Sequence, residues 1–185
     1  MSFCFPDVFC FWRNHTMKTI YLAGGCFWGT QKFLAQFKGV SSTEVGYANG
    51  NTENPTYQEV CKGSGHAETV KVIFDETLLP LENLLGFYFQ AIDPTSVNKQ
   101  GEDTGVQYRT GIYYEDASLA DGVNAFLENK RQELASQGKA LAVESGVLKQ
   151  FFTAEEYHQD YLDKNPTGYC HLRPELFEIA QKYQV

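Results

Sequence analysis

A glycine-rich turn at residues 24–29, with the sequence Gly-Gly-Cys-Phe-Trp-Gly, constrains the fold of this chain more than any other feature. It follows a strand-like segment at residues 18–23, and the pattern predicts a helix that begins near Phe27. Glycine permits a sharp turn and a close approach of the backbone to a ligand. We therefore expect Cys26 at a helix N-terminus, where free N–H groups and the helix dipole favour the reactive thiolate.

Two aromatic residues, Phe27 and Trp28, follow this cysteine directly. We interpret them as walls of a small apolar pocket beside the thiol. Cysteine also packs well in protein cores, so a buried and inert Cys26 is the alternative. The preceding glycines, the helix start and the two aromatic rings together favour a reactive cysteine.

The remaining pattern predicts an α+β chain. Strands are expected at residues 18–23, 40–48, 67–75, 108–114 and 141–144, and helices at residues 27–39, 80–92, 117–137 and 153–165. Their order up to the third helix is the split βαβ pattern of a ferredoxin-like two-layer α/β sandwich, here with C-terminal additions. Two polar segments, 49–65 and 95–107, are expected to be long loops, which often carry function.

The length of 185 residues fits one domain with a single core. Residues 1–16 are rich in aromatic side chains but lack the basic start of a signal peptide. Because Met17 stands directly before the first strand, we expect a single domain over residues 17–185 and a dispensable N-terminal extension over residues 1–16. We expect the C-terminal segment from about residue 165 to be mobile.

Composition excludes several classes of function. The net charge of −8, without a Lys/Arg cluster, argues against nucleic acid as a partner. No segment approaches the run of about 20 apolar residues that spans a membrane. The five cysteines contain no C-x-x-C pair, which argues against a structural zinc site. We expect reduced thiols, a cytoplasmic location, no bound metal or cofactor, and a monomer.

Glu68 is the second candidate for chemistry. By the period of two it shares a strand face with Val70 and Phe74. Burial on that face would keep the carboxyl group protonated near neutrality and make it a possible general acid. Alternation alone equally allows a strand-end glutamate whose carboxylate turns into solvent.

Other candidates carry weaker signals. Cys170 lies in a glycine-containing loop and is either an incidental surface thiol or a second redox cysteine that reaches Cys26. A disulfide would need the two Cα atoms within roughly 7 Å. On sequence alone, Tyr57, Asp103 and Tyr108 are ordinary loop and strand-start residues.

Taken together, these motifs resemble the peptide methionine sulfoxide reductases of the A type. The matching runs follow one another in order at residues 25–29, 46–47, 54–57, 65–68, 105–110, 157–159, 161–162 and 165–170. The resemblance thus covers the chain from about Lys18 to Cys170. Several separated motifs in order are far more specific than one pentapeptide.

The resemblance implies a role for each site residue. It implies that Cys26 is the nucleophile toward the sulfoxide sulfur and that Phe27 and Trp28 surround the substrate methyl group. It implies Glu68 as the general acid, with Tyr57 and Tyr108 as hydrogen-bond donors to the sulfoxide oxygen. Asp103 would support the polar network, and Cys170 would be the resolving cysteine. The domain over residues 17–185 would then be catalytic.

The implied activity is that of a peptide-methionine (S)-S-oxide reductase. Such an enzyme reduces methionine-S-sulfoxide, free or in oxidised proteins and peptides, through a cysteine sulfenic acid, and so repairs proteins after oxidation. Thioredoxin, or dithiothreitol in vitro, would be the reductant. Some members carry a further recycling cysteine, but none follows Cys170 here, so the Cys26–Cys170 disulfide would itself react with thioredoxin.

Two other functions remain open at this point. One is a redox-regulated binding module in which Cys26 and Cys170 switch a surface. The other is a thiol hydrolase that pairs Cys26 with a histidine, for which His66, His158 and His171 are formal candidates. Only a reductase would consume dithiothreitol in step with methionine formed from a methionine sulfoxide peptide.

Overall fold

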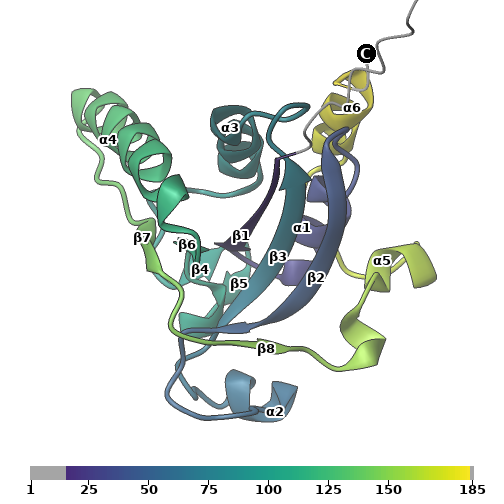
Figure 1. Cartoon of the computed structure of the whole chain (residues 1–185). Coiled ribbons are helices and arrows are strands. Elements are labelled where there is room, and N and C mark those ends of the chain that lie inside the picture. The colour runs from purple at the N-terminus through teal and green to yellow at the C-terminus, as the bar shows by residue number, and fades with distance from the viewer. Residues whose placement is uncertain (1–15, 184–185) are drawn as a thin grey trace, which may run out of the picture.

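The computed structural model describes residues 16–183, so the predicted extension, apart from Thr16, lies outside the described residues. A six-stranded sheet in the order β7-β6-β1-β3-β2-β8 forms the centre of the molecule (Figure 1). The strands of this sheet are β1 (Met17–Ala23), β2 (Val40–Ala48), β3 (Ala67–Asp75), β6 (Gly111–Tyr114), β7 (Glu144–Val147) and β8 (Phe151–Thr153). Two short strands, β4 (Lys99–Gln100) and β5 (Asp103–Thr104), form a separate ribbon.

Over the described residues, six α-helices accompany the sheet. They are α1 (Phe27–Leu34), α2 (Tyr57–Cys61), α3 (Leu81–Ala91), α4 (Ala120–Ser136), α5 (Tyr161–Lys164) and α6 (Pro174–Lys182). Helix α1 packs against α3, α5 and α6, and α3 packs against α4. The helices α2 and α5 lie toward the end of the sheet that β8 crosses (Figure 1). The predicted mixture of helices around a central sheet is confirmed.

The pairing of the central strands fixes the register of the site. Strand β1 runs antiparallel to β3, with Met17 opposite Asp75 and Ala23 opposite Thr69. Strand β2 is antiparallel to β3 on its other side, and β6 is antiparallel to β1. Strands β2 and β3 have the predicted bounds. In β3 the alternate residues Val70, Val72 and Phe74 are fully buried, as expected for one face of a strand.

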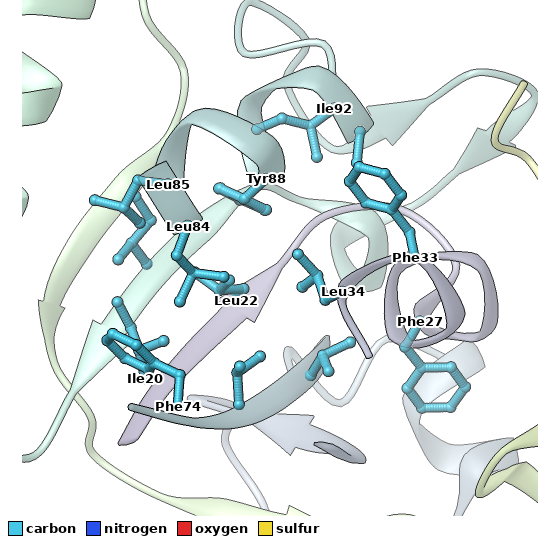
Figure 2. Close-up of a cluster of buried hydrophobic side chains, with 14 of the residues drawn as sticks. Ile20, Leu22, Phe27, Phe33, Leu34, Phe74, Leu84, Leu85, Tyr88 and Ile92 are labelled. Atoms are coloured by element: carbon cyan, nitrogen blue, oxygen red, sulfur yellow. The ribbon is translucent and has the colours of Figure 1, made fainter. Parts of the chain in front are cut away.

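The main core lies between the sheet and the helices. On β1, Ile20 and Leu22 are fully buried, since residues two apart share one face of a strand. Figure 2 shows these side chains together with Leu34 from α1 and Leu84 from α3. A smaller apolar cluster covers the opposite face of the sheet and comprises Tyr21, Ala23, Ala48, Ala67 and Tyr113.

Helix α3 holds the glycine-rich turn after β1. The Tyr88 hydroxyl is fully buried and donates hydrogen bonds to the carbonyls of Ala23 and Gly111, which lie opposite each other on β1 and β6. A Cβ on Gly24 would come within 2.6 Å of Ile92 Cγ2, so the turn packs directly on the end of α3. Gly25 has a φ of 71°, which favours glycine.

The end of the chain returns to the helical layer. In α6, Leu176 and Ala180 are buried, and Phe177 meets Phe33 of α1 edge-on with the ring centroids 6.1 Å apart. Residues 165–173, which link α5 to α6 and carry Cys170, are called the C-terminal loop below.

The prediction of one helix over residues 153–165 is wrong. Thr153 ends β8 and donates to Glu44 instead of capping a helix. A 3-10 turn and the short α5 follow, separated by Asp160, whose φ of 52° interrupts helical geometry. The reason is a long-range contact, because the Gln159 side chain hydrogen-bonds both the N–H and the carbonyl of Val45 and so fixes the chain to β2.

Other elements also differ from the sequence predictions. The strand expected at residues 141–144 is β7, which begins only at Glu144 and pairs in parallel with β6. The loop over residues 49–65 contains α2, whose capping box joins Thr56 and Glu59. The loop over residues 95–107 contains the β4–β5 ribbon, and Tyr108 ends a 3-10 turn instead of beginning a strand.

Replacement of Tyr88 by phenylalanine tests whether α3 holds the turn. We expect Tyr88→Phe to lower the free energy of unfolding by about 1–3 kcal/mol, because buried carbonyls lose a donor. The matched control Tyr183→Phe removes a hydroxyl that accepts an exposed hydrogen bond from Asn83 and should cost less than about 0.5 kcal/mol. Urea unfolding measures both losses, and equal values would contradict the assignment.

Candidate active site

Cys26 lies between β1 and α1, as the sequence predicts. It is the N-cap residue of α1, with extended backbone angles and a side chain that is 7% exposed. The N–H groups of Trp28 and Gly29 point toward its sulfur. The preceding residue, Gly25, donates its N–H to the Tyr108 carbonyl at 3.3 Å, which brings the turn at residues 106–108 to the same place.

Glu68 is buried beside this helix start. It lies near the beginning of β3 with 2% of its surface exposed, so of the two positions that alternation left open, Glu68 takes the buried one. Its Oε2 accepts a hydrogen bond from the Phe27 N–H at 3.1 Å. Burial raises the pKa of Glu68 to about 8; the Phe27 hydrogen bond acts in the opposite direction, and the charge of Asp103 adds to the rise. The carboxyl group therefore holds a proton at neutral pH.

The Cys26 thiol differs from the sequence prediction. Burial raises the pKa of Cys26 well above its ordinary value, and the negative charges of Glu68 and Asp103 act in the same direction. The N–H groups of Trp28 and Gly29 lower this pKa, but desolvation outweighs them. The expectation that the helix start alone favours the thiolate is wrong for the protein without substrate, because the same turn buries the sulfur.

Two phenols approach Glu68 from opposite loops. Tyr57 is the first residue of α2, and Tyr108 ends the 3-10 turn before β6. Burial raises the pKa of both hydroxyls, and the charge of Glu68 is the next largest cause for each. Both hydroxyls are therefore protonated hydrogen-bond donors near the carboxyl group.

Aromatic rings form a wall next to Cys26. Phe27 packs against Tyr47 with the ring centroids 6.0 Å apart, and Trp28 stacks on Tyr161 at 3.8 Å. The Trp28 indole N–H donates to His158 Nδ1 at 3.0 Å. The His158 ring also lies 5.1 Å from the Phe27 ring and 4.6 Å from that of Tyr57.

Glu155 joins several parts of this wall. Its Oε2 accepts from the Tyr47 hydroxyl at 2.7 Å, and its Oε1 accepts from the Tyr57 backbone N–H at 2.9 Å. It therefore ties β2 to the first turn of α2. Glu155 carries no sequence signal of this role, and the sequence offers His158 only as a possible base, since no local spacing shows which residues they contact.

Asp103 connects the site to the C-terminal loop. Its Oδ1 accepts from the Tyr169 hydroxyl at 3.1 Å, while its buried Oδ2 has no hydrogen-bond partner within residues 16–183. The charge of Asp103 raises the pKa values of Glu68, Cys26 and Tyr108. Asp103 thus lies close enough to influence the thiol, the carboxyl group and one of the two phenols of the site.

Cys170 lies beside the first turn of α1. It is a free, half-buried thiol whose Sγ is 3.0 Å from the point that a Cβ on Gly29 would occupy. Gly29 is three residues after Cys26 on this helix start, so the fold brings the two cysteines to the same turn. The third described cysteine, Cys61, is exposed at the end of α2.

Two of the three candidate histidines, His66 and His158, do not form a hydrolase site with Cys26. The rings of His66 and His158 are held elsewhere: His66 accepts from the Gly50 N–H and contacts Thr52, and His158 accepts from Trp28. His171 follows Cys170 and packs against the glycine-rich turn. Over the described residues, His, Cys, Asp and Glu form no cluster suited to a metal ion.

Residues 16–183 contain no helix with the length and apolar character needed to cross a membrane.

The raised pKa of Glu68 predicts how stability depends on pH. In the unfolded chain glutamate ionises near pH 4.3, whereas the folded protein keeps this proton up to about pH 8. Between these two pH values folding takes up a proton. The free energy of unfolding therefore falls as pH rises, by up to about 1.4 kcal/mol per pH unit. Glu68→Gln should remove this dependence and be more stable than the parent protein at neutral pH.

Urea unfolding over this pH range measures the effect. Glu53→Gln, a change at an exposed position, is the control and should keep the slope of the parent protein. A Glu68→Gln variant with the same slope would show that this carboxyl group is ionised in the folded state.

Comparison with known proteins assigns the family. The family model described as peptide methionine sulfoxide reductase matches residues 18–184. "Peptide methionine sulfoxide reductase MsrA" of Lachnoclostridium phytofermentans is 55% identical over 166 residues, which cover 89% of this chain and 98% of that protein.

Solved structures show the same similarity. Methionine sulfoxide reductase A of Corynebacterium diphtheriae has a TM-score of 0.77 and 37% identity, with 83% of this chain and 77% of that chain covered. Reduced Mxr1 from Saccharomyces cerevisiae has a TM-score of 0.74 and 36% identity, with 83% and 88% covered. The chain therefore belongs to the peptide methionine sulfoxide reductase family.

Proposed function

We propose that this chain reduces methionine-S-sulfoxide, free or in oxidised proteins, to methionine, with Cys26 as nucleophile and Glu68 as general acid. One observation carries the proposal: a buried, protonated carboxyl group is hydrogen-bonded to the residue that follows a buried thiol. A sulfoxide oxygen leaves sulfur only when it is protonated, so both groups must act on neighbouring atoms. The wall next to Cys26 offers an apolar surface for the methyl group, formed by Phe27 and Trp28.

The first half of the reaction transfers oxygen from substrate to enzyme. The Cys26 sulfur attacks the sulfoxide sulfur while Glu68 gives its proton to the oxygen, with Tyr57 and Tyr108 as further donors to that oxygen. An S–S bond joins Cys26 to the substrate, and the S–O bond of the substrate breaks as the protonated oxygen leaves as hydroxide. This hydroxide adds to the Cys26 sulfur, the S–S bond breaks, methionine leaves, and Cys26 becomes a sulfenic acid. The proton released from the Cys26 thiol restores Glu68. Asp103 orients the polar network, and exclusion of water strengthens each of these interactions.

The second half returns the enzyme to its starting state. The Cys170 thiol attacks the sulfenic sulfur, water leaves, and a Cys26–Cys170 disulfide forms. A dithiol then reduces this disulfide by exchange. We propose thioredoxin as the physiological dithiol and dithiothreitol as its substitute in vitro, without a bound cofactor. The position of Cys170 beside Gly29 supports this role, and Mxr1 has been solved in complex with Trx2.

The finer features of the molecule are proposals as well. The strand order β6-β1-β3-β2, with crossovers through α1 and α3, supports a ferredoxin-like sandwich to which β7, β8, α5 and α6 are additions. We propose that residues 17–185 form a monomeric, cytoplasmic catalytic domain and that residues 1–16 are dispensable. Movement of the C-terminal loop would let the reductant reach Cys170.

Two cysteine variants test the division into half-reactions. Cys26→Ser should form no methionine from a methionine sulfoxide peptide with dithiothreitol. Cys170→Ser should release about one methionine per chain and then stop when thioredoxin is the reductant. Cys61→Ser, which changes the other described thiol, is the control and should keep thioredoxin-driven turnover. Normal thioredoxin-driven turnover by Cys170→Ser would show that another cysteine resolves the sulfenic acid.

Glu68→Gln tests the general acid. In a single turnover we expect methionine release to slow by about 100-fold or more, because the amide has no proton to donate. In the parent protein the rate should fall as pH rises through about 8, where Glu68 loses its proton, and the variant should lack this fall. Alkylation of Cys26 by iodoacetamide serves as the control for an intact thiol. An unchanged rate would remove Glu68 as the acid.

A further inference from the structure

His171 lies against the glycine-rich turn that carries Cys26. Its ring meets two of the three glycines of this turn: Nε2 is 2.7 Å from the point that a Cβ on Gly25 would occupy, and Nδ1 is 3.2 Å from that of Gly29. The Cys170 sulfur is 3.0 Å from the same point at Gly29. The imidazole therefore reaches along the helix start from the residue before Cys26 to the side of the Cys170 thiol.

Both ring nitrogens of His171 are buried without a hydrogen-bond partner among the residues that the structure describes. Buried polar atoms are almost always hydrogen-bonded, so two such atoms on one ring require a reason. A role in packing alone does not supply one, because a ring without nitrogen atoms would fill the same space at a lower desolvation cost. Catalytic groups are a recognised exception, since their partner is present only during the reaction.

We propose that His171 accepts the proton of the Cys170 thiol during formation of the Cys26–Cys170 disulfide. The inference rests on the function proposed above and concerns its second half-reaction. It adds a residue to which neither the sequence motifs nor the sulfoxide chemistry gave a role.

The charges around the ring are consistent with proton transfer. Burial lowers the pKa of His171 and Asp103 raises it in part, so the imidazole is neutral near pH 7 and able to accept a proton. The other charged groups nearby are Lys32 of α1, which acts on Cys170, and Asp93 and Arg173, which line the hollow on the outer side of the ring. The neighbouring Gln100 of β4 is neutral.

The thiol itself needs such an acceptor. Burial raises the pKa of Cys170, although the Leu172 N–H and the charge of Lys32 act in the opposite direction. At neutral pH the resolving group is therefore a thiol, whereas attack on a sulfenic acid requires the thiolate.

The step balances without a further reactant. His171 takes the proton from Cys170, the resulting thiolate forms the S–S bond with Cys26, and the S–O bond of the sulfenic acid breaks. The leaving hydroxide takes the proton from the imidazolium and departs as water. The sulfenic acid itself oxidises the Cys170 thiolate, so the step needs no external oxidant or reductant, and His171 ends in its neutral form.

A single-turnover experiment on the full chain tests this role. Reduced protein is mixed with free methionine sulfoxide without reductant, and samples are quenched over time with an alkylating reagent. Released methionine reports the first half-reaction, and peptide mass spectrometry of alkylated Cys170 reports the second. The variants are His171→Gln and His171→Phe, of which the latter keeps a ring against Gly25 and Gly29. Arg173→Gln, an exposed change at the end of the same loop, is the matched control.

We expect both His171 variants to release methionine at the parent rate and to lose the Cys170 thiol about 100-fold more slowly near neutral pH. The difference should shrink as pH rises, because Cys170 then ionises unaided. Disulfide formation at the parent rate would overturn the proposal, as would an equal slowing at every pH, which would indicate only a structural role. A parent protein that releases no methionine would instead contradict the proposed function itself.

Discussion

The hydrogen bond from the Phe27 N–H to Glu68 Oε2 joins a helix of this molecule to its central sheet. It connects β3 at the centre of the sheet to the first turn of α1, from a residue 41 positions earlier in the sequence, and so fixes the acid Glu68 beside the Cys26 thiol. The rest of the site is arranged around this link. The wall of rings begins at Phe27, the phenols approach Glu68, and the C-terminal loop brings Cys170 to the turn that follows.

Burial favours the reaction at one reacting group, Glu68, and opposes it at the other, Cys26. It keeps the proton on Glu68, which the chemistry requires, and it also keeps the proton on Cys26, which the chemistry must remove. A helix N-terminus is often sufficient to activate a cysteine, but here desolvation outweighs the N–H groups of Trp28 and Gly29. The resting site is therefore neutral at both reacting groups. Charges would form only when a sulfoxide enters the site and its oxygen accepts the proton of Glu68.

Sequence patterns predicted the parts of this arrangement that local periodicity determines. The bounds of β3 follow from alternation and the place of Cys26 follows from glycines between a strand and a helix, whereas alternation left the burial of Glu68 open. Contacts between residues that lie far apart in the sequence could not be predicted from these patterns. No local signal shows that Gln159 would fix the chain to β2, which divides the expected last helix, or that Glu155 would join Tyr47 to the backbone of Tyr57. Desolvation of Cys26 is likewise a property of the packed molecule, which residue spacing does not reveal.

The hydrogen bond from Tyr169 to Asp103 links Glu68 indirectly to the C-terminal loop. Asp103 holds the C-terminal loop through this hydrogen bond, and its charge also raises the pKa of Glu68. With the proposed departure of the loop, water would reach Asp103 and screen its charge, and the pKa of Glu68 would move downward. The infrared carbonyl band of the protonated Glu68 carboxyl group would then be an intrinsic spectroscopic reporter of whether the loop is docked, without an attached label.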